Sequence, residues 1–459
     1  MSGKRFQIAK KINESEDKMK KNIMKFAALA LVVLMLAACG GAPAETTKEE
    51  GKPTEAGKVE LTVQAEEAWV PHYEAAIARV KEAYPDAEIT IKKVGAFDHL
   101  ETMDTTDAGN PDVADVFALP ADRIFGLAQR EVLAGMDAKK MAEELGGWKD
   151  FDAGIGGQFV KDGEYLAFPY NIETLITFAN KANAEATGVD LTKPVEVNGA
   201  PNEATALLPL FDYWYGVAAT NSAGVEPLAK AEDGKLTSDL TADWSELAPE
   251  KQAMFTALYD YWKRNADAGT ALFDADAGWG YIDTAFATGG KGVVRLGGPW
   301  DTATISKQAG DGNDLEIFPI DKITLGGKPL VHWKGGWGLG INARIEGDET
   351  KMAVAQKLIQ EIVNPKFAAD LFKTTGKILE NVSAEEYAKM DLPEIDKKVI
   401  AAVIESYEIA PARPLFLEFG KVWDTWKNAV LSWNSVKPAS PEDAYKEIQA
   451  SFKAMMDAM

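Results

Sequence analysis

Cysteine and histidine are almost absent from this sequence of 459 residues. Its single cysteine is Cys39, and its three histidines are His72, His99 and His332, which lie far apart along the chain. One cysteine cannot form an internal disulfide, and no group of cysteines and histidines has the spacing of metal ligands. The sequence therefore predicts a fold without disulfides and without a zinc or other metal site.

Positive charge is also in short supply. The chain carries 49 lysine and arginine residues against 71 aspartate and glutamate residues, for a net charge of −22. A general nucleic-acid-binding protein needs a basic face to meet phosphates, so this balance excludes that class. A phosphate loop ending in Gly-Lys-Ser/Thr is missing as well, and the glycines of residues 335–340 lack the dinucleotide-binding spacing. We therefore expect neither nucleotide hydrolysis nor a cofactor.

A short apolar segment lies near the N-terminus. Residues 26–36 are apolar and follow three basic residues, Lys20, Lys21 and Lys25. A membrane-spanning helix needs about 20 apolar residues, so a segment of this length is typical of a signal peptide instead.

This segment ends in Leu-Ala-Ala-Cys at residues 36–39, followed by two glycines. The motif resembles the lipobox of a bacterial lipoprotein, in which the cysteine is linked to diacylglycerol and becomes the new N-terminus. The resemblance implies a signal peptide at residues 1–38, with Met19 as an alternative start, and an extracytoplasmic chain anchored to the cell membrane through lipidated Cys39. Residues 39–58 then form a flexible tether, because they are polar and rich in glycine, alanine and proline.

Apolar periodicity after the tether predicts alternating strands and helices. Residues 59–63 alternate as in a strand, residues 71–84 keep helical spacing, and residues 89–94 alternate again. Strand, helix and strand within about 35 residues predict a βαβ unit with parallel strands. Further strands are expected at 112–119, 166–168, 174–178, 292–296, 315–318 and 337–342, and helices at 123–133, 350–363, 366–374, 384–390, 395–407, 415–433 and 441–457.

Five segments carry a resemblance to a known family. They are Gly-Asn-Pro-Asp-Val at 109–113 with 121–129, Gly-Glu-Tyr-Leu-Ala-Phe-Pro-Tyr-Asn at 163–171 continuing to 181, 285–289 with Gly-Gly-Pro-Trp at 297–300, Gly-Trp-Gly-Leu-Gly at 336–340 continuing to 343, and 411–430. In this order they resemble the maltose/maltodextrin-binding proteins of bacterial ABC importers, family 1 of the extracellular solute-binding proteins. One such segment alone is a weak signal, but five in the family's order over nearly the whole mature chain are specific.

The resemblance implies an α/β fold of the periplasmic-binding-protein type II, with two lobes around a ligand cleft and several hinge crossings. One lobe would comprise residues 59–171 and 327–378, and the other residues 172–326 and 379–459. Ligand binding would close the lobes by a hinge motion. The resemblance also implies a monomer that delivers its ligand to the transmembrane subunits of an ABC permease.

A sugar presents hydroxyl edges, which need paired donors and acceptors, and flat C–H faces, which suit aromatic rings. Twelve tryptophans are available for such contacts. By resemblance, the ligand-binding residues would be Asp122, Arg123, Glu173, Tyr213, Trp300 and Trp423, joined by Glu67 and Trp69.

Some of these positions keep alternatives. Trp214 and Tyr215 are interchangeable with Tyr213, because the segment before them diverges from the family. Trp426 is the alternative to Trp423, because both lie on one apolar stripe whose spacing alone is typical of a core. At the start of the fold Glu66, Glu67 and Trp69 replace an acidic-basic pair of the family, so their contacts cannot be copied.

The function predicted from these residues is capture of maltose, maltodextrin or a related oligosaccharide for import. Only Arg123 among the cations has a cleft position by resemblance, which favours a neutral ligand over an anionic one. A galactan-type oligosaccharide or a non-sugar solute remains an alternative on the same fold. A glycosidase that uses Asp122 and Glu173 as its paired carboxylates is a further alternative, but no catalytic-domain signature surrounds these residues, so we expect no enzyme.

Overall fold

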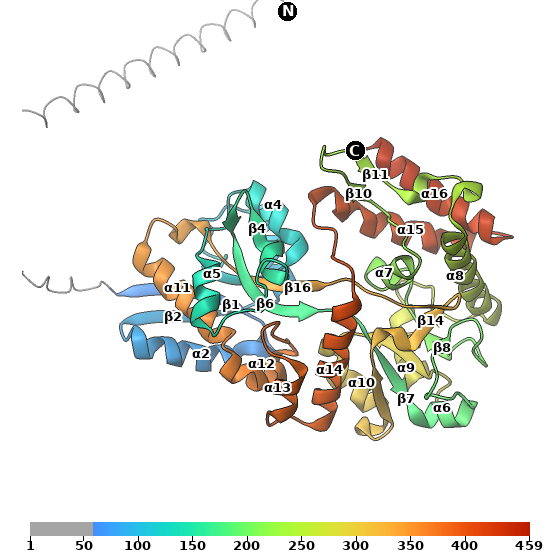
Figure 1. Ribbon diagram of the computed structural model, residues 1–459, viewed down its shortest axis with the longest axis horizontal. Coiled ribbons are helices and arrows are strands. Elements are labelled where there is room, and N and C mark those ends of the chain that lie inside the picture. Colours follow the sequence, from blue (N-terminus) through green and yellow to red (C-terminus); the bar gives the residue numbers. More distant parts are fainter. Residues whose placement is uncertain (1–57) are drawn as a thin grey trace, which may run out of the picture. The chain divides into compact units, whose positions relative to one another are not determined.

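The computed structural model describes residues 58–459, and Figure 1 shows their arrangement. The predicted signal peptide, the lipidation site Cys39 and nearly all of the predicted tether lie outside the described residues. Within residues 58–459, no helix combines the length and the apolar character needed to cross a membrane.

The first of two main sheets has five strands in the order β2-β1-β3-β16-β6. Their bounds are β1 Val59–Ala65, β2 Ala87–Lys93, β3 Val116–Pro120, β6 Ala167–Glu173 and β16 Gly335–Ile341. β1 runs parallel to both β2 and β3, whereas β16 runs antiparallel to β3 and β6. The predicted parallel βαβ unit is therefore confirmed, and β16 inserts a late part of the chain into the middle of this sheet.

The βαβ unit forms because its apolar side chains share one side. Leu61 and Val63 of β1 are buried, and helix α2 (Val70–Ala83) begins with Pro71 in its first turn, where no intrahelical N–H is needed. Tyr73 and Val80 of α2 are fully buried. Helix α11 (Glu349–Ile362) packs against both α2 and β1, so this face of the sheet is covered by helices from distant parts of the chain (Figure 1).

The second main sheet has the order β13-β7-β12-β9. Its strands are β7 Ile176–Asn180, β9 Ala206–Leu207, β12 Val294–Gly297 and β13 Leu315–Phe318. β7 is antiparallel to β12 and β13. A smaller three-stranded sheet comprises β8 Val195–Glu196, β14 Ile323–Leu325 and β15 Lys328–Pro329. Two further pairs of strands are β4 Val160–Lys161 with β5 Glu164–Tyr165, and β10 Ala229–Lys230 with β11 Leu236–Thr237.

The remaining helices surround these sheets. They are α3 Ala96–Thr105, α4 Ile124–Gln129, α5 Ala138–Glu144, α6 Lys181–Thr187, α7 Tyr213–Ser222, α8 Pro249–Ala268, α9 Gly278–Phe286, α10 Thr302–Gln308, α12 Ala368–Thr375, α13 Ala384–Lys389, α14 Glu394–Ile409, α15 Gly420–Val436 and α16 Pro441–Asp457. α14 contacts β7 and β13 of the second sheet and also β6 of the first (Figure 1). The mixed α/β architecture with a mainly helical last third agrees with the sequence patterns.

The helix expected at residues 123–133 is wrong in its extent. A 3-10 turn at Ala121–Arg123 leads into α4, which ends at Gln129. Glu131 has φ 53°, a left-handed conformation that cannot continue an α-helix. Leu133 instead forms a β-bridge with Asn342, because the chain turns back here toward the end of β16.

The chain crosses between the two main sheets close to the predicted lobe boundaries. The boundary predicted at residue 171 falls within β6, and β7 of the second sheet starts at Ile176. The boundary predicted after residue 378 lies at a bridge between Ile172 and Ile378. The exact division of the chain into lobes stays a prediction.

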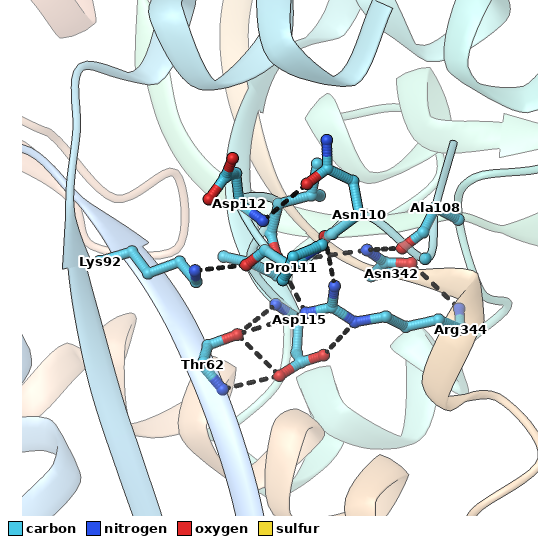
Figure 2. Close-up of polar contacts among 12 residues, drawn as sticks. Thr62, Lys92, Ala108, Asn110, Pro111, Asp112, Asp115, Asn342 and Arg344 are labelled. Atoms are coloured by element: carbon cyan, nitrogen blue, oxygen red, sulfur yellow. Dashed lines mark hydrogen bonds and ion pairs between the residues drawn. The ribbon is translucent and has the colours of Figure 1, made fainter. Parts of the chain in front are cut away.

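Two of the segments that carry the family resemblance meet in a polar network beside β1 (Figure 2). Asp115 accepts hydrogen bonds from the backbone N–H and the hydroxyl of Thr62, each at 2.7 Å, and pairs with Nε of Arg344 at 2.7 Å. Arg344 also donates to the backbone oxygen of Asn110, and Asn342 donates to that of Ala108. These residues therefore join the loop before β3 to the end of β16, which is a structural role.

Candidate ligand-binding site

Residues from the strands, turns and helices around both main sheets line a cavity of about 630 Å³. Its walls comprise Glu66, Trp69, Phe97, Pro120, Asp122, Arg123, Glu173, Trp214, Tyr215, Trp300, Trp337, Thr375, Lys377, Arg413 and Trp423. Five of these are tryptophans, and six are charged. Among residues 58–459, no three or more His, Cys, Asp or Glu side chains are grouped so as to hold a metal ion. The walls thus combine flat apolar rings with charged hydrogen-bonding groups.

Asp122 and Arg413 form an ion pair in the cavity wall. Asp122 lies in the 3-10 turn directly after β3, and its Oδ2 is 2.7 Å from Nη2 of Arg413. The Arg413 side chain is only 5% exposed, and its guanidinium lies 5.5 Å from the ring centroid of Trp214 and 5.7 Å from that of Trp423. Oδ1 of Asp122 is buried and has no partner among the described residues. This oxygen is therefore an acceptor in need of a donor, such as a ligand hydroxyl.

Glu173 ends β6 and faces Trp337 of the neighbouring strand β16. Nε1 of Trp337 donates to Oε2 of Glu173 at 2.6 Å. Burial raises the pKa of Glu173, while the positive charges of Lys377 and Arg413 and the Trp337 hydrogen bond oppose this rise. The carboxylate and the indole ring fix one another, which holds the ring face of Trp337 in place at the cavity.

Lys377 follows helix α12 and is 8% exposed. Burial lowers its pKa to about 8, although the carboxylates of Glu173 and Glu66 act in the opposite direction. A buried ammonium therefore stands beside two carboxylates in the same cavity.

Trp214, Trp300 and Trp423 lie near one another in the cavity wall. Trp300 is 45% exposed, and its ring centroid is 6.4 Å from that of Trp214. The ring folds back over Gly298, where a Cβ atom would collide with it, so glycine at this position is required for the pose of the ring. Trp214 and Trp423 are stacked with an interplanar angle of 24° and a centroid separation of 6.5 Å. Such ring faces suit the C–H face of a sugar.

The structure brings six of the eight predicted ligand-binding residues to this cavity. They are Trp69, Asp122, Arg123, Glu173, Trp300 and Trp423. Arg123 also forms an ion pair with Asp104 of α3. The alternative Trp426 is instead fully buried, with its Nε1 donating to the backbone oxygen of Leu210 at 2.8 Å.

Tyr213 does not line the cavity, contrary to its predicted role. The Asp212 side chain caps α7 by accepting from the backbone N–H of Trp214, which fixes where the helix begins. This start turns Tyr213 into the core, where it packs against Trp333 and Trp426. The two alternatives at this position, Trp214 and Tyr215, reach the cavity instead.

Glu67 is also absent from the cavity wall. Its side chain is exposed and pairs with Lys93 at 3.1 Å, because it points outward from the 3-10 turn Glu67–Trp69. The preceding residue, Glu66, lines the cavity and accepts a hydrogen bond from the backbone N–H of Ala96 at 3.2 Å.

Sequence reasoning missed six residues of the cavity: Phe97, Pro120, Trp337, Thr375, Lys377 and Arg413. Trp337 and Arg413 lie within segments that carry the family resemblance, so those segments held a signal for them. Lys377 and Phe97 had none. The expectation that Arg123 is the only cation at this site is wrong, because Lys377 and Arg413 line it too.

The chain is similar to known binding proteins over most of its length. The family described as "Bacterial extracellular solute-binding protein" matches residues 75–395. The diacetylchitobiose binding protein DasA of Streptomyces coelicolor is 24% identical over 451 residues, which are 95% of this chain and 98% of DasA.

Two solved structures have the same fold. The maltose-binding protein MalE of Listeria monocytogenes, in complex with maltose, has a TM-score of 0.65 and 19% identity, over 87% of this chain and 99% of MalE. MalX of Streptococcus pneumoniae, in complex with maltopentaose, has a TM-score of 0.65 and 18% identity, over 86% of this chain and 99% of MalX. The predicted two-lobe α/β fold is therefore confirmed.

Proposed function

We propose, since the chain belongs to the bacterial extracellular solute-binding protein family, that it captures an oligosaccharide in the cavity and delivers it to an ABC permease. Membership of this family confirms the resemblance seen in the sequence and implies a location outside the cytoplasm. The ligand class and the residues that contact it are the proposal.

The composition of the cavity wall favours an oligosaccharide as the ligand. The cavity combines five tryptophan rings with the free buried oxygen Oδ1 of Asp122 and with the carboxylates of Glu66 and Glu173. Ring faces bind the C–H faces of pyranoses, and carboxylates accept hydroxyl hydrogens in charge-assisted bonds about twice as strong as neutral ones. A cavity of about 630 Å³ accommodates a ligand of oligosaccharide size.

Relatives support the same class without deciding the sugar. DasA is named for diacetylchitobiose, and the MalE and MalX structures hold maltose and maltopentaose. We propose a maltodextrin or a related oligosaccharide, with a galactan-type sugar as the alternative.

We further propose that the protein binds its ligand without cleaving it. Oδ2 of Asp122 pairs with Arg413, and Oε2 of Glu173 accepts from Trp337. These contacts fix both carboxylates in place, so that their remaining oxygens can accept hydrogen bonds from ligand hydroxyls. Incubation with the bound oligosaccharide should return it intact, and released monosaccharide would overturn this part of the proposal.

The lipid anchor is a separate proposal that rests on the motif at residues 36–39. Expression in bacteria should yield a membrane-bound form with diacylglycerol on Cys39. Cys39→Ser should release the protein from the membrane fraction. A Cys39→Ser variant that stays membrane-bound would contradict the anchor.

Isothermal titration calorimetry tests the proposed function. The purified protein is titrated with maltose, maltotriose, diacetylchitobiose, and galacto- and xylo-oligosaccharides. We expect micromolar binding of at least one of them, abolished or strongly weakened by Trp300→Ala. Absence of heat with every oligosaccharide would reject the proposed ligand class while leaving the fold unaffected.

A further inference from the structure

The ammonium group of Lys377 lies inside a cage of three aromatic rings. Its Nζ is 4.9 Å from the ring centroid of Trp69, 4.9 Å from that of Tyr170 and 4.7 Å from that of Trp337. Cations within about 6 Å of a ring centroid are attracted by the ring quadrupole. This ammonium has no hydrogen bond and no ion pair within the part of the chain that the structure describes, and the three ring faces lie within cation–π distance of it.

The backbone holds Lys377 against the cage from both sides. Gly376 ends α12 in the left-handed conformation, with φ 68°, and the N–H of Lys377 donates to the hydroxyl of Thr375 at 3.1 Å. On the other side, the carbonyl of Ile378 accepts from the N–H of Ile172 in β6 at 2.9 Å. Tyr170 lies two residues earlier on that strand, so the lysine is placed beside the cage by its own main chain.

Each ring is held by contacts that do not involve Lys377. The hydroxyl of Tyr170 accepts from that of Tyr73 at 3.1 Å, and Trp69 packs edge-on against Tyr170 with centroids 5.8 Å apart. Trp337 is fixed by its hydrogen bond to Glu173. The cage therefore should persist when the lysine side chain is removed.

The surroundings of the cage are negative. Glu66 and Glu173 line the same cavity as Trp69 and Trp337, and both carboxylates act on the Lys377 ammonium. Aromatic rings with adjacent carboxylates are the chemistry that recognises ammonium and quaternary ammonium ligands. Without its lysine, this part of the cavity would be a cation site open to solutes.

We propose that Lys377 is a specificity-determining residue that fills an aromatic cation cage with the protein's own ammonium and thereby excludes cationic solutes from the cavity. This inference rests on the proposed function in taking the cavity as the solute site. It deepens that function, because a solute with an ammonium group meets both an occupied cage and the repulsion of Lys377. The ligand class selected is accordingly an oligosaccharide without a cationic group.

The test is a gain of binding. Choline, a trimethylammonium compound, is titrated into the wild-type protein and into Lys377→Ala. We expect Lys377→Ala to bind choline at least about tenfold more tightly than the wild type, since the emptied cage regains a cation. The uncharged analogue of choline, with a tert-butyl group in place of trimethylammonium, should bind both proteins equally weakly.

Lys377→Met is the matched control, because its side chain is uncharged but still fills the cage. It should bind choline no better than the wild type. Thermal unfolding verifies that each variant is folded, and Lys377→Ser replaces Lys377→Ala if the alanine variant does not fold.

Two results would overturn the inference: a folded Lys377→Ala or Lys377→Ser that binds choline no more tightly than the wild type does, or one that binds the uncharged analogue as tightly as it binds choline. None of these measurements uses a sugar. A wild type that binds no oligosaccharide would therefore reject the proposed function alone, and choline binding would still decide the role of Lys377.

Discussion

Arg413 and Asp122 are joined by a contact of 2.7 Å that leaves one carboxylate oxygen of Asp122 buried and unused. The pair brings the segment before α15 to the turn after β3. Oδ2 neutralises a buried guanidinium, and Oδ1 has no partner among the described residues, so we propose that Oδ1 accepts from a ligand hydroxyl.

Asp122→Ala should destabilise the fold as well as weaken ligand binding. Removal of the carboxylate leaves the Arg413 guanidinium, only 5% exposed, without its counter-ion. Breaking a fully buried pair costs 3–5 kcal/mol, and because Asp122 is 29% exposed we expect a loss of about 2 kcal/mol in unfolding free energy. Urea denaturation measures this loss.

Arg123→Ala is the matched control for Asp122→Ala. Its ion pair with Asp104 joins side chains that are 34% and 43% exposed. Such exposed pairs contribute about 0–1 kcal/mol to stability, so Arg123→Ala should lower the unfolding free energy by at most about 1 kcal/mol. Equal destabilisation by both variants would contradict the distinct role given to the Asp122–Arg413 pair.

Trp300→Ala should reduce affinity without reducing stability. The Trp300 ring is 45% exposed, so little packing is lost when it is removed. A stacking tryptophan at a binding site is typically worth about 2 kcal/mol, or roughly thirtyfold in the dissociation constant. Calorimetric titration with the bound oligosaccharide measures the change.

Trp244→Ala provides the comparison, because Trp244 packs on Tyr445 and does not line the cavity. It should lower the unfolding temperature and leave affinity unchanged. If both tryptophan variants lost affinity equally, Trp300 would have no specific contact with the ligand.

Substitutions of the neighbouring residues Tyr213 and Trp214 should affect different properties, the first mainly stability and the second mainly ligand affinity. Tyr213→Ala removes a buried ring and should cost about 3–5 kcal/mol of stability. Trp214→Ala removes a half-buried ring from the cavity wall, and we expect its main effect on ligand affinity. Denaturation and titration of both variants compare the two effects, and the reverse pattern would show that Tyr213 faces the ligand after all.

Stability should depend on pH through Lys377. Burial lowers the pKa of its ammonium to about 8, from an unfolded value near 10.5. Between these values the unfolded chain binds the proton that the folded chain has released, so the unfolding free energy rises with pH in this window.

The rise should be on the order of 2 kcal/mol between about pH 8 and pH 10 and should be missing in Lys377→Met. Comparing the two proteins cancels other groups, such as the buried tyrosines. A difference between wild type and variant that is constant across this range would show that the Lys377 pKa is not lowered.

The sequence predicted those parts of the fold and site that are encoded locally or by ordered motifs. Alternating Leu61 and Val63 predicted a strand of the first sheet, and the motifs around Asp122 and Trp300 predicted cavity residues. Tyr213 was misplaced because consecutive helical residues point about 100° apart, and only the cap by Asp212 decides which of them faces the cavity.

Lys377 could not have been predicted in the same way. Its cage is assembled from Trp69, Tyr170 and Trp337, which belong to three separate elements. Nothing near residue 377 in the sequence encodes those partners, because only the insertion of β16 beside β6 brings Trp337 to the cage.

We propose that an oligosaccharide binds between the two lobes and stabilises their closed arrangement. A ligand shifts such an equilibrium only by binding the closed form more tightly. Small-angle X-ray scattering of the purified protein, with and without a saturating oligosaccharide found by titration, tests this most directly. We predict a smaller radius of gyration with ligand in the wild type, and a smaller change in Trp300→Ala at the same ligand concentration because its affinity is lower. Superimposable scattering curves for the wild type with and without saturating ligand would show that the ligand does not close the lobes.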